Sequence, residues 1–123
     1  MPSISHDRAL TQAEFDLFAK VSGDNNPIHV DPDFSARTRF GRTVSHGMLL
    51  YTVLWGLLQQ RHPGARQINH SMMFPNPAYA GEALRFVLDE IASGEGRRSY
   101  AAKVTRIADG AVVLDGQTEI ALP

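Results

Sequence analysis

The chain has no cysteine among its 123 residues. It therefore cannot form a disulfide, a thiolate zinc site or a cysteine nucleophile. An excess of charge of one sign is also missing, because twelve basic and thirteen acidic residues give a formal net charge of −1. This balance excludes a general attraction for nucleic acid, so no nucleic-acid partner is expected.

The sequence features of a signal peptide and of a membrane span are not found either. Residues 1–10 lack the basic start and the apolar core of a signal peptide, which makes a cytoplasmic protein the expectation. The main apolar run, residues 47–58, is shorter than the roughly 20 residues that cross a bilayer, so no membrane partner is expected. A hydrophobic content of 43% and a charged content of 20% are typical of a globular protein, and the length predicts a single domain, residues 1–123.

The N-terminal part of the chain predicts a strand followed by a helix. Residues 4–9 form the leading strand of this prediction. Thr11 and Glu14 show the spacing of a capping box, in which the two side chains satisfy free amide groups at the start of a helix. A helix is therefore predicted over residues 12–21, and Gly23 is a suitable residue to end it.

The remainder of the chain predicts one apolar helix and four strands. Residues 47–58 are apolar on nearly every side, so we expect a helix that is buried on nearly every side. Asp109-Gly110 favours a tight two-residue hairpin, and residues 93–96 favour a looser one. The predicted strands are Ile68–Phe74, Leu84–Ile91, Arg98–Ile107 and Val112–Leu122.

This order of elements predicts an α+β fold in which a curled antiparallel sheet wraps around one central apolar helix. A curled sheet is the simplest cover for such a helix in so short a chain. The sheet would still have open edge strands, and part of the helix would remain uncovered. We therefore expect a homodimer or a higher homo-oligomer.

Residues 22–31, Ser-Gly-Asp-Asn-Asn-Pro-Ile-His-Val-Asp, form the segment with the clearest chemical content. Pro27 restricts the backbone of its own residue and of the residue before it, so Asp24 and His29 are predicted to lie on a constrained loop. A carboxylate and an imidazole held together can transfer protons near neutral pH. The alternative is an Asx-rich turn whose side chains cap local backbone groups.

Two segments together resemble a known family. Residues 18–31 resemble the hydratase 2 motif of MaoC-like dehydratases, and residues 40–49, Phe-Gly-Arg-Thr-Val-Ser-His-Gly-Met-Leu, are similar to the segment that leads into the central helix of that family. The resemblance implies a hot-dog fold, usually dimeric, and acyl thioesters of coenzyme A or of acyl carrier protein as substrates. It also implies (R)-specific hydration of trans-2-enoyl thioesters, or the reverse dehydration.

The resemblance also implies roles for four residues. Asp24 and His29 match the catalytic pair of the family, and Asn26 matches the asparagine beside them, which we expect to contact substrate. Gly47 matches the glycine whose backbone amide contacts the thioester carbonyl. This reaction needs proton transfer and a stabilised enolate oxygen, which a helix N-terminus can supply, so no cofactor is expected.

The chain departs from the family pattern in two places. Many members carry a lysine or an arginine just after the phenylalanine that corresponds to Phe74, whereas residues 75–77 here are Pro-Asn-Pro. This difference leaves open how the phosphates of coenzyme A are held and whether coenzyme A is the carrier. Tyr51 and Trp55 are bulkier than the residues often found in the helix, and we expect them to be core residues.

Other polar residues have both a functional and an ordinary structural interpretation. Arg37, Arg39 and Arg42 could meet a pantetheine-linked phosphate, but solvated loop charges are commoner. His46 is expected to have a capping or packing role together with Ser45.

A metal site is not expected, although Asp24, His29, Asp31 and Asp33 lie close together in sequence. The calcium-loop template requires an acceptor and a glycine where Ile28 and His29 stand. A pair of histidines four residues apart on a helix, which would suit zinc, is also missing from the predicted helices.

Two other functions stay open. The first is a thioesterase on the same scaffold, in which an acid directs water against the carbonyl carbon rather than the alkene. The second is a non-catalytic module that binds acyl thioesters. The spacing of Asp24, Asn26, Pro27 and His29 favours hydration, because the fold alone does not discriminate between these functions.

Overall fold

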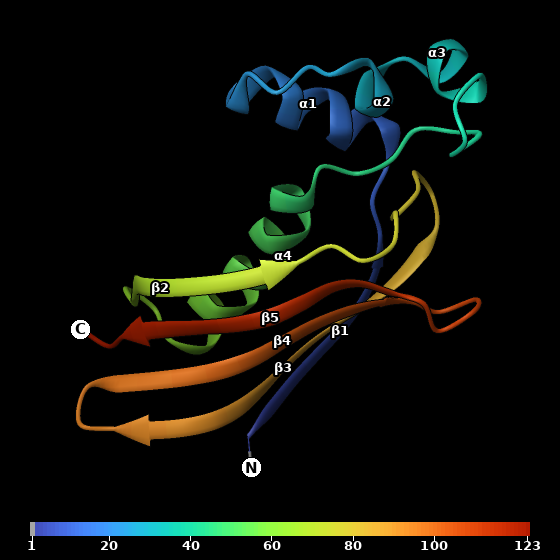
Figure 1. Ribbon diagram of the computed structural model, residues 1–123. Helices are drawn as coiled ribbons and strands as arrows, with labels where there is room; N and C mark the ends of the chain where they lie inside the picture. The colour runs from blue at the N-terminus through green and yellow to red at the C-terminus, as the bar shows by residue number, and fades with distance from the viewer. Residues whose placement is uncertain (1) are drawn as a thin grey trace.

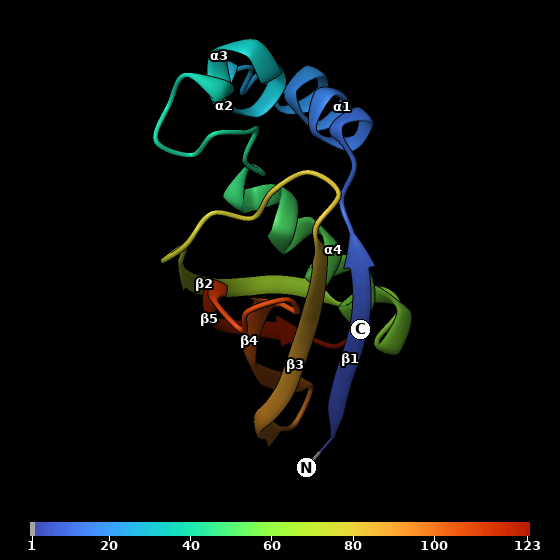
Figure 2. The same cartoon turned by 90° about the vertical axis from the view of Figure 1, so that its right-hand side faces the viewer.

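The computed structural model describes residues 2–123 and contains one antiparallel sheet with the strand order β1-β3-β4-β5-β2. The sheet twists so strongly that β1 and β3 run nearly across the direction of β2 (Figures 1 and 2). The strands are β1 (Ser3–Ala9), β2 (Arg66–Met73), β3 (Ala83–Gly94), β4 (Arg97–Arg106) and β5 (Val112–Ala121).

Helix α4 (Gly47–Arg61) lies inside the curve of this sheet, and the core lies between the two (Figure 1). Leu54 and Leu58 of α4 and Phe86 and Leu88 of β3 are fully buried in one cluster. In β3, buried side chains alternate with more exposed ones, because successive side chains of a strand point to opposite faces. The predicted α+β architecture, with a curled sheet around an apolar helix, is therefore confirmed.

One face of α4 is exposed, contrary to the prediction that the helix would be buried on nearly every side. The exposed residues Met48, Thr52, Gly56 and Gln60 follow one another at intervals of four and so lie on one side of the helix. A single sheet covers only the opposite side. Tyr51 is buried in the core, as predicted, whereas Trp55 is only partly buried and packs against the core.

The two hairpin loops have the reverse of the predicted lengths. The connection from β3 to β4 is the tight one, with only Glu95 and Gly96 between the strands, whereas residues 107–111 join β4 to β5. In the longer loop the carboxylate of Asp109 accepts hydrogen bonds from the guanidinium of Arg106 and from the amide of Ala111. These bonds stabilise a wider turn than the Asp-Gly pair alone predicts.

Three helices form a separate layer at one end of the sheet, above the first turn of α4 (Figure 2). They are α1 (Gln12–Ser22), α2 (Pro27–Val30) and α3 (Pro32–Ala36). The capping box of Thr11 and Glu14 is present, as predicted. No helix within residues 2–123 is long and apolar enough to cross a membrane.

Candidate active site

The backbone between α1 and α2 places Asp24 beside the start of α4. Gly23 ends α1 with a φ of 81°, a left-handed conformation that glycine adopts without strain, and its amide donates to the carbonyl of Ala19 at 2.9 Å. The amide of Asp24 then donates to the hydroxyl of Ser22 at 3.1 Å. The chain therefore leaves α1 sharply, and the Asp24 side chain remains half-exposed.

The sequence predicted that residues 24–29 form a loop, but α2 begins at Pro27. The side chain of Asn26 accepts a hydrogen bond from the amide of Ile28 at 3.2 Å, and Pro27 occupies the first turn, where its missing amide proton has no cost. This short helix turns His29 inward, so that the residue is only 8% exposed. The prediction was wrong because a helix of four residues leaves no periodic pattern in the sequence.

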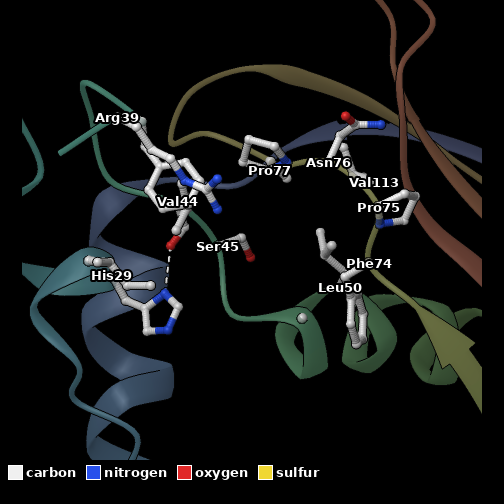
Figure 3. A pocket seen from close by; sticks show the side chains of 14 residues that line it. His29, Arg39, Val44, Ser45, Leu50, Phe74, Pro75, Asn76, Pro77 and Val113 are labelled. Carbon is white, nitrogen blue, oxygen red and sulfur yellow. Dashed lines mark hydrogen bonds between the residues drawn. The ribbon is translucent and has the colours of Figure 1, made fainter.

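The imidazole of His29 has a defined orientation. Its Nδ1 lies 2.7 Å from the carbonyl oxygen of Val44, as the dashed line in Figure 3 shows. Since a carbonyl oxygen only accepts, Nδ1 carries the proton, and Nε2 of the neutral ring has a free lone pair. Nε2 faces Asp24 at 3.8 Å from Oδ2, which is too long for a direct hydrogen bond.

The segment that carries Val44 is itself held by α1 and α2. The amide of Val44 donates to the carbonyl of Ile28 at 3.0 Å. The side chain of Gln12 donates to the carbonyl of His29 at 2.9 Å and accepts from the hydroxyl of Thr43 at 2.6 Å. Because these bonds join three segments, the position of the His29 ring relative to α4 is set by the tertiary structure.

His46 completes a cluster with Asp24 and His29. Its ring stacks on the ring of His29 with centroids 3.9 Å apart, and its Nε2 lies 2.8 Å from the carbonyl oxygen of Asp24. It precedes α4 but makes no side-chain cap, so the capping part of the sequence prediction was wrong and the packing part was right. Its partners are Asp24 and His29 rather than Ser45, whose hydroxyl donates to the carbonyl of His46.

Two cavities meet at the first residue of α4. A cavity of about 250 Å³ is lined by His29, Gly47 and Phe74, and a second of about 340 Å³ by Asp24, Gly47 and Phe74. The two members of the predicted catalytic pair thus lie in neighbouring cavities that share Gly47 and Phe74. Other residues on the apolar wall of the first cavity are Ile28, Phe40, Leu50 and Val113.

Gly47 has no room for a side chain. A Cβ at this position would lie 2.7 Å from Cζ of Phe74, whose ring projects from the segment after β2 (Figure 3). The first amide groups of a helix have no partner within the helix and carry a partial positive charge. The start of α4 therefore presents polar N–H groups to a largely apolar space.

The other residues named in the sequence analysis differ in whether they line the two cavities. Asn26 caps α2 and lines neither cavity, whereas Arg39 and Asn76 both line the first cavity. Arg42 pairs with Glu82 and lies over the ring of Tyr79 at 4.1 Å, so its role is structural. The sequence alone did not reveal Phe74 as a site residue, because its contact with Gly47 joins segments 27 positions apart.

Asp24, His29 and His46 each offer a possible metal-ligand atom within 4.8 Å of the others. Their arrangement is poorly suited to a metal ion. The two imidazole planes are only 23° from parallel, so their lone pairs do not converge on one point. Nε2 of His46 also carries a proton, because it faces the carbonyl oxygen of Asp24.

Comparison with known proteins identifies the family. Residues 2–112 match the family model described as MaoC like domain. The chain belongs to the MaoC-like family. Its structure has the hot-dog fold that the sequence resemblance implied.

MaoC-like proteins similar to this chain include named enzymes. It is 37% identical over 115 residues to an (R)-specific enoyl-CoA hydratase of Aeromonas caviae, covering 90% of this chain and 85% of that protein. It is 36% identical over 110 residues to a 3-hydroxybutyryl-CoA dehydratase of Methylorubrum extorquens, covering 86% and 69%. The solved structure of an (R)-hydratase of A. caviae superposes with a TM-score of 0.93 at 29% identity, covering 99% and 95%.

Proposed function

We propose that this MaoC-like protein is a lyase that hydrates trans-2-enoyl thioesters to (R)-3-hydroxyacyl thioesters, or catalyses the reverse dehydration. The observation that carries the proposal is the 3.8 Å separation of Asp24 Oδ2 and His29 Nε2 beside the start of α4. The similarity to enoyl-CoA hydratases and dehydratases supports it. The substrate is an acyl thioester of coenzyme A or of acyl carrier protein.

In this proposal one water molecule lies between Asp24 and His29. A water oxygen about 2.8 Å from both side-chain atoms fits between them at their separation of 3.8 Å, so each group accepts one hydrogen bond from the same water. When the water oxygen bonds to C3 of the alkene, the pair removes a proton, and it returns a proton to C2. We assign this proton to the pair and not to either residue alone.

Charge collects on the thioester oxygen while C3 is attacked, because the electrons of the double bond move toward the carbonyl. We assign the backbone amide of Gly47 to this oxygen, since it lines both cavities and opens α4. A helix N-terminus in an apolar space stabilises such an oxyanion more than water does. The missing side chain lets the carbonyl approach the backbone.

We assign Asn26 to positioning. Its side chain is engaged with the amide of Ile28, and through this cap it holds α2 and the orientation of His29. This proposal replaces the direct substrate contact that the family resemblance implied with an indirect role.

Purified protein mixed with crotonyl-CoA is expected to remove the enone absorbance without releasing free thiol. Hydration consumes the alkene and leaves the thioester intact, so a thiol reagent reports no product. The two signals should be followed in parallel, and chiral analysis should find the (R)-3-hydroxy product. Longer 2-enoyl-CoA substrates and the corresponding carrier-protein thioesters then define the acyl group and the carrier.

Two other outcomes of this assay would contradict the hydratase proposal. Release of thiol with the enone intact would indicate the thioesterase alternative. Binding of each thioester without loss of enone or release of thiol would indicate a non-catalytic acyl-thioester module.

We further propose that the protein is a homodimer joined through β2. This strand is an edge of the sheet, so one side of its backbone is unpaired. Ile68 is 38% exposed and Met73 is 65% exposed, whereas the other edge strand, β1, carries charged side chains. Phe74 follows β2 directly, so the proposed interface adjoins the two cavities.

Introducing lysine at Ile68 and Met73 together is expected to convert the dimer into a monomer. Two like charges would face the same charges of the second copy across the strand pair, and like charges directly opposite are unfavourable. Light scattering after size-exclusion chromatography gives the mass. The matched control is Ile107→Lys, because Ile107 is similarly exposed, at 42%, but lies outside β2. A monomeric wild type, or an unchanged mass in the double variant, would contradict the proposal.

A further inference from the structure

We propose that His46 is a positioning residue that holds Asp24 and His29 at the separation needed to share one water molecule. The inference rests on the proposed hydratase function. His46 contacts both residues at once, although it lies 22 positions from Asp24 and 17 from His29 in the sequence. Its role is to arrange the two groups, and it transfers no proton itself.

The contact to Asp24 is a hydrogen bond to the backbone. Nε2 of His46 donates to the Asp24 carbonyl oxygen at 2.8 Å. This bond joins His46, just before α4, to the loop between Gly23, which ends α1, and Asn26, which caps α2. The Asp24 carboxylate is half-exposed and makes no hydrogen bond within residues 2–123 that would hold it. The backbone bond therefore supplies the restraint that the side chain lacks.

The contact to His29 is a ring stack. The two imidazole centroids are 3.9 Å apart with the planes at 23°, and the ring of Phe18 packs edge-on against His46 with centroids 4.9 Å apart. Nδ1 of His29 is held by Val44, so the ring can only swing about that bond. A side chain of similar size beside the ring limits this movement, so the stack is packing that another residue can replace, whereas the hydrogen bond to Asp24 needs an N–H donor.

His46 must stay neutral for this arrangement to work, because a second positive ring would oppose proton uptake by His29. Burial, the largest influence, lowers the pKa of His46, and the hydrogen bond to the Asp24 carbonyl opposes this only in part. Nδ1 of His46 is buried and has no hydrogen-bond partner within residues 2–123, which costs free energy of folding. A buried unpaired nitrogen is uncommon in structures and is consistent with a functional constraint on this residue.

Two variants separate the hydrogen bond from the packing. His46→Gln keeps an N–H donor at the end of a side chain of similar reach but removes the ring. His46→Phe keeps a stacked ring but removes the donor. With crotonyl-CoA, we expect kcat to fall about tenfold in the Phe variant and to stay within about threefold of wild type in the Gln variant. KM should change less than kcat in both, because the contacts of His46 are with the catalytic pair.

The opposite order, with the Phe variant more active than the Gln variant, would overturn the proposal, because a purely structural residue needs the ring more than the donor. Equal activities in the two variants would overturn it too. Thermal melting of both variants shows whether they fold. A wild type without hydratase activity contradicts the proposed function instead. Imidazole NMR spectra of the wild type test the role of His46 independently of that result.

The tautomers can be read from the wild-type protein without substrate. Two-bond ¹H–¹⁵N spectra of the imidazoles should show His46 protonated at Nε2 and His29 protonated at Nδ1, since each of these nitrogens faces a carbonyl oxygen. The spectrum of His46→Gln assigns the signals. Protonation of His46 at Nδ1 alone would remove the hydrogen bond to Asp24 and overturn the inference even in an active enzyme.

Discussion

Replacing His29 by alanine is expected to lower kcat for hydration of crotonyl-CoA by about 10³-fold, and Asp24→Asn by a similar factor, because a positioned acid–base group contributes about 10²–10⁴-fold. Alanine removes the Nε2 lone pair that faces Asp24 at 3.8 Å. The carboxamide of asparagine keeps the shape of the side chain but accepts no proton from water. Initial rates of enone loss, with substrate concentration varied, measure both effects.

Matched controls are available for both substitutions. Asp31→Asn is the same chemical change seven positions away, and asparagine can replace Asp31 as the cap of α3, where the carboxylate accepts from the amide of Phe34. His6→Ala removes an exposed histidine of β1. Both controls should retain nearly full activity. If Asp24→Asn or His29→Ala folded normally and turned over crotonyl-CoA like the controls, the assignment of the catalytic pair would be wrong.

Gly47→Ala is expected to lower kcat by about 10²–10³-fold, the usual effect of losing one oxyanion donor. The added methyl group would narrow the space beside the first amide of α4, where the carbonyl is proposed to bind. It would also lie 2.7 Å from the ring of Phe74, so the ring has to move. Steady-state kinetics and a thermal melt measure the catalytic and the structural effects separately.

The double variant Gly47→Ala/Phe74→Ala distinguishes these two effects. Removing the ring leaves room for the methyl group, so the melting temperature should recover relative to Gly47→Ala, while kcat should stay low. Gly56→Ala is the control within the same helix, because a Cβ at that exposed position meets nothing within 4 Å. Full activity in the double variant would show that Gly47 is needed only to make room for Phe74.

Local sequence signals predicted most of the elements. The capping box of Thr11 and Glu14 joins residues three positions apart and is present, and the predicted strand Leu84–Ile91 lies within β3. Such signals can be read from the sequence because they involve hydrogen bonds and burial patterns among residues that are close together in the chain. The turns at residues 95–96 and 107–111 were exchanged because the ion pair of Arg106 with Asp109 shapes the longer one.

The site shows the same division between local and long-range information. The sequence by itself determined that an acid, a carboxamide and an imidazole follow one another on a constrained segment before an apolar helix. Spacing alone could not reveal which side chains meet. His46 bonds to Asp24 and Phe74 covers Gly47 only because α1, α2 and the segment after β2 are packed around the start of α4.

The amino-acid sequence therefore determined the family, the helix caps, the strand pattern and the residues able to move a proton, since these depend on residue types at short spacing. Only the tertiary structure decided that Asp24 and His29 face each other at 3.8 Å and that His46 holds both. The physical reason is that hydrogen bonds and ring contacts act over a few ångströms, so residues distant in sequence interact only after the chain has folded.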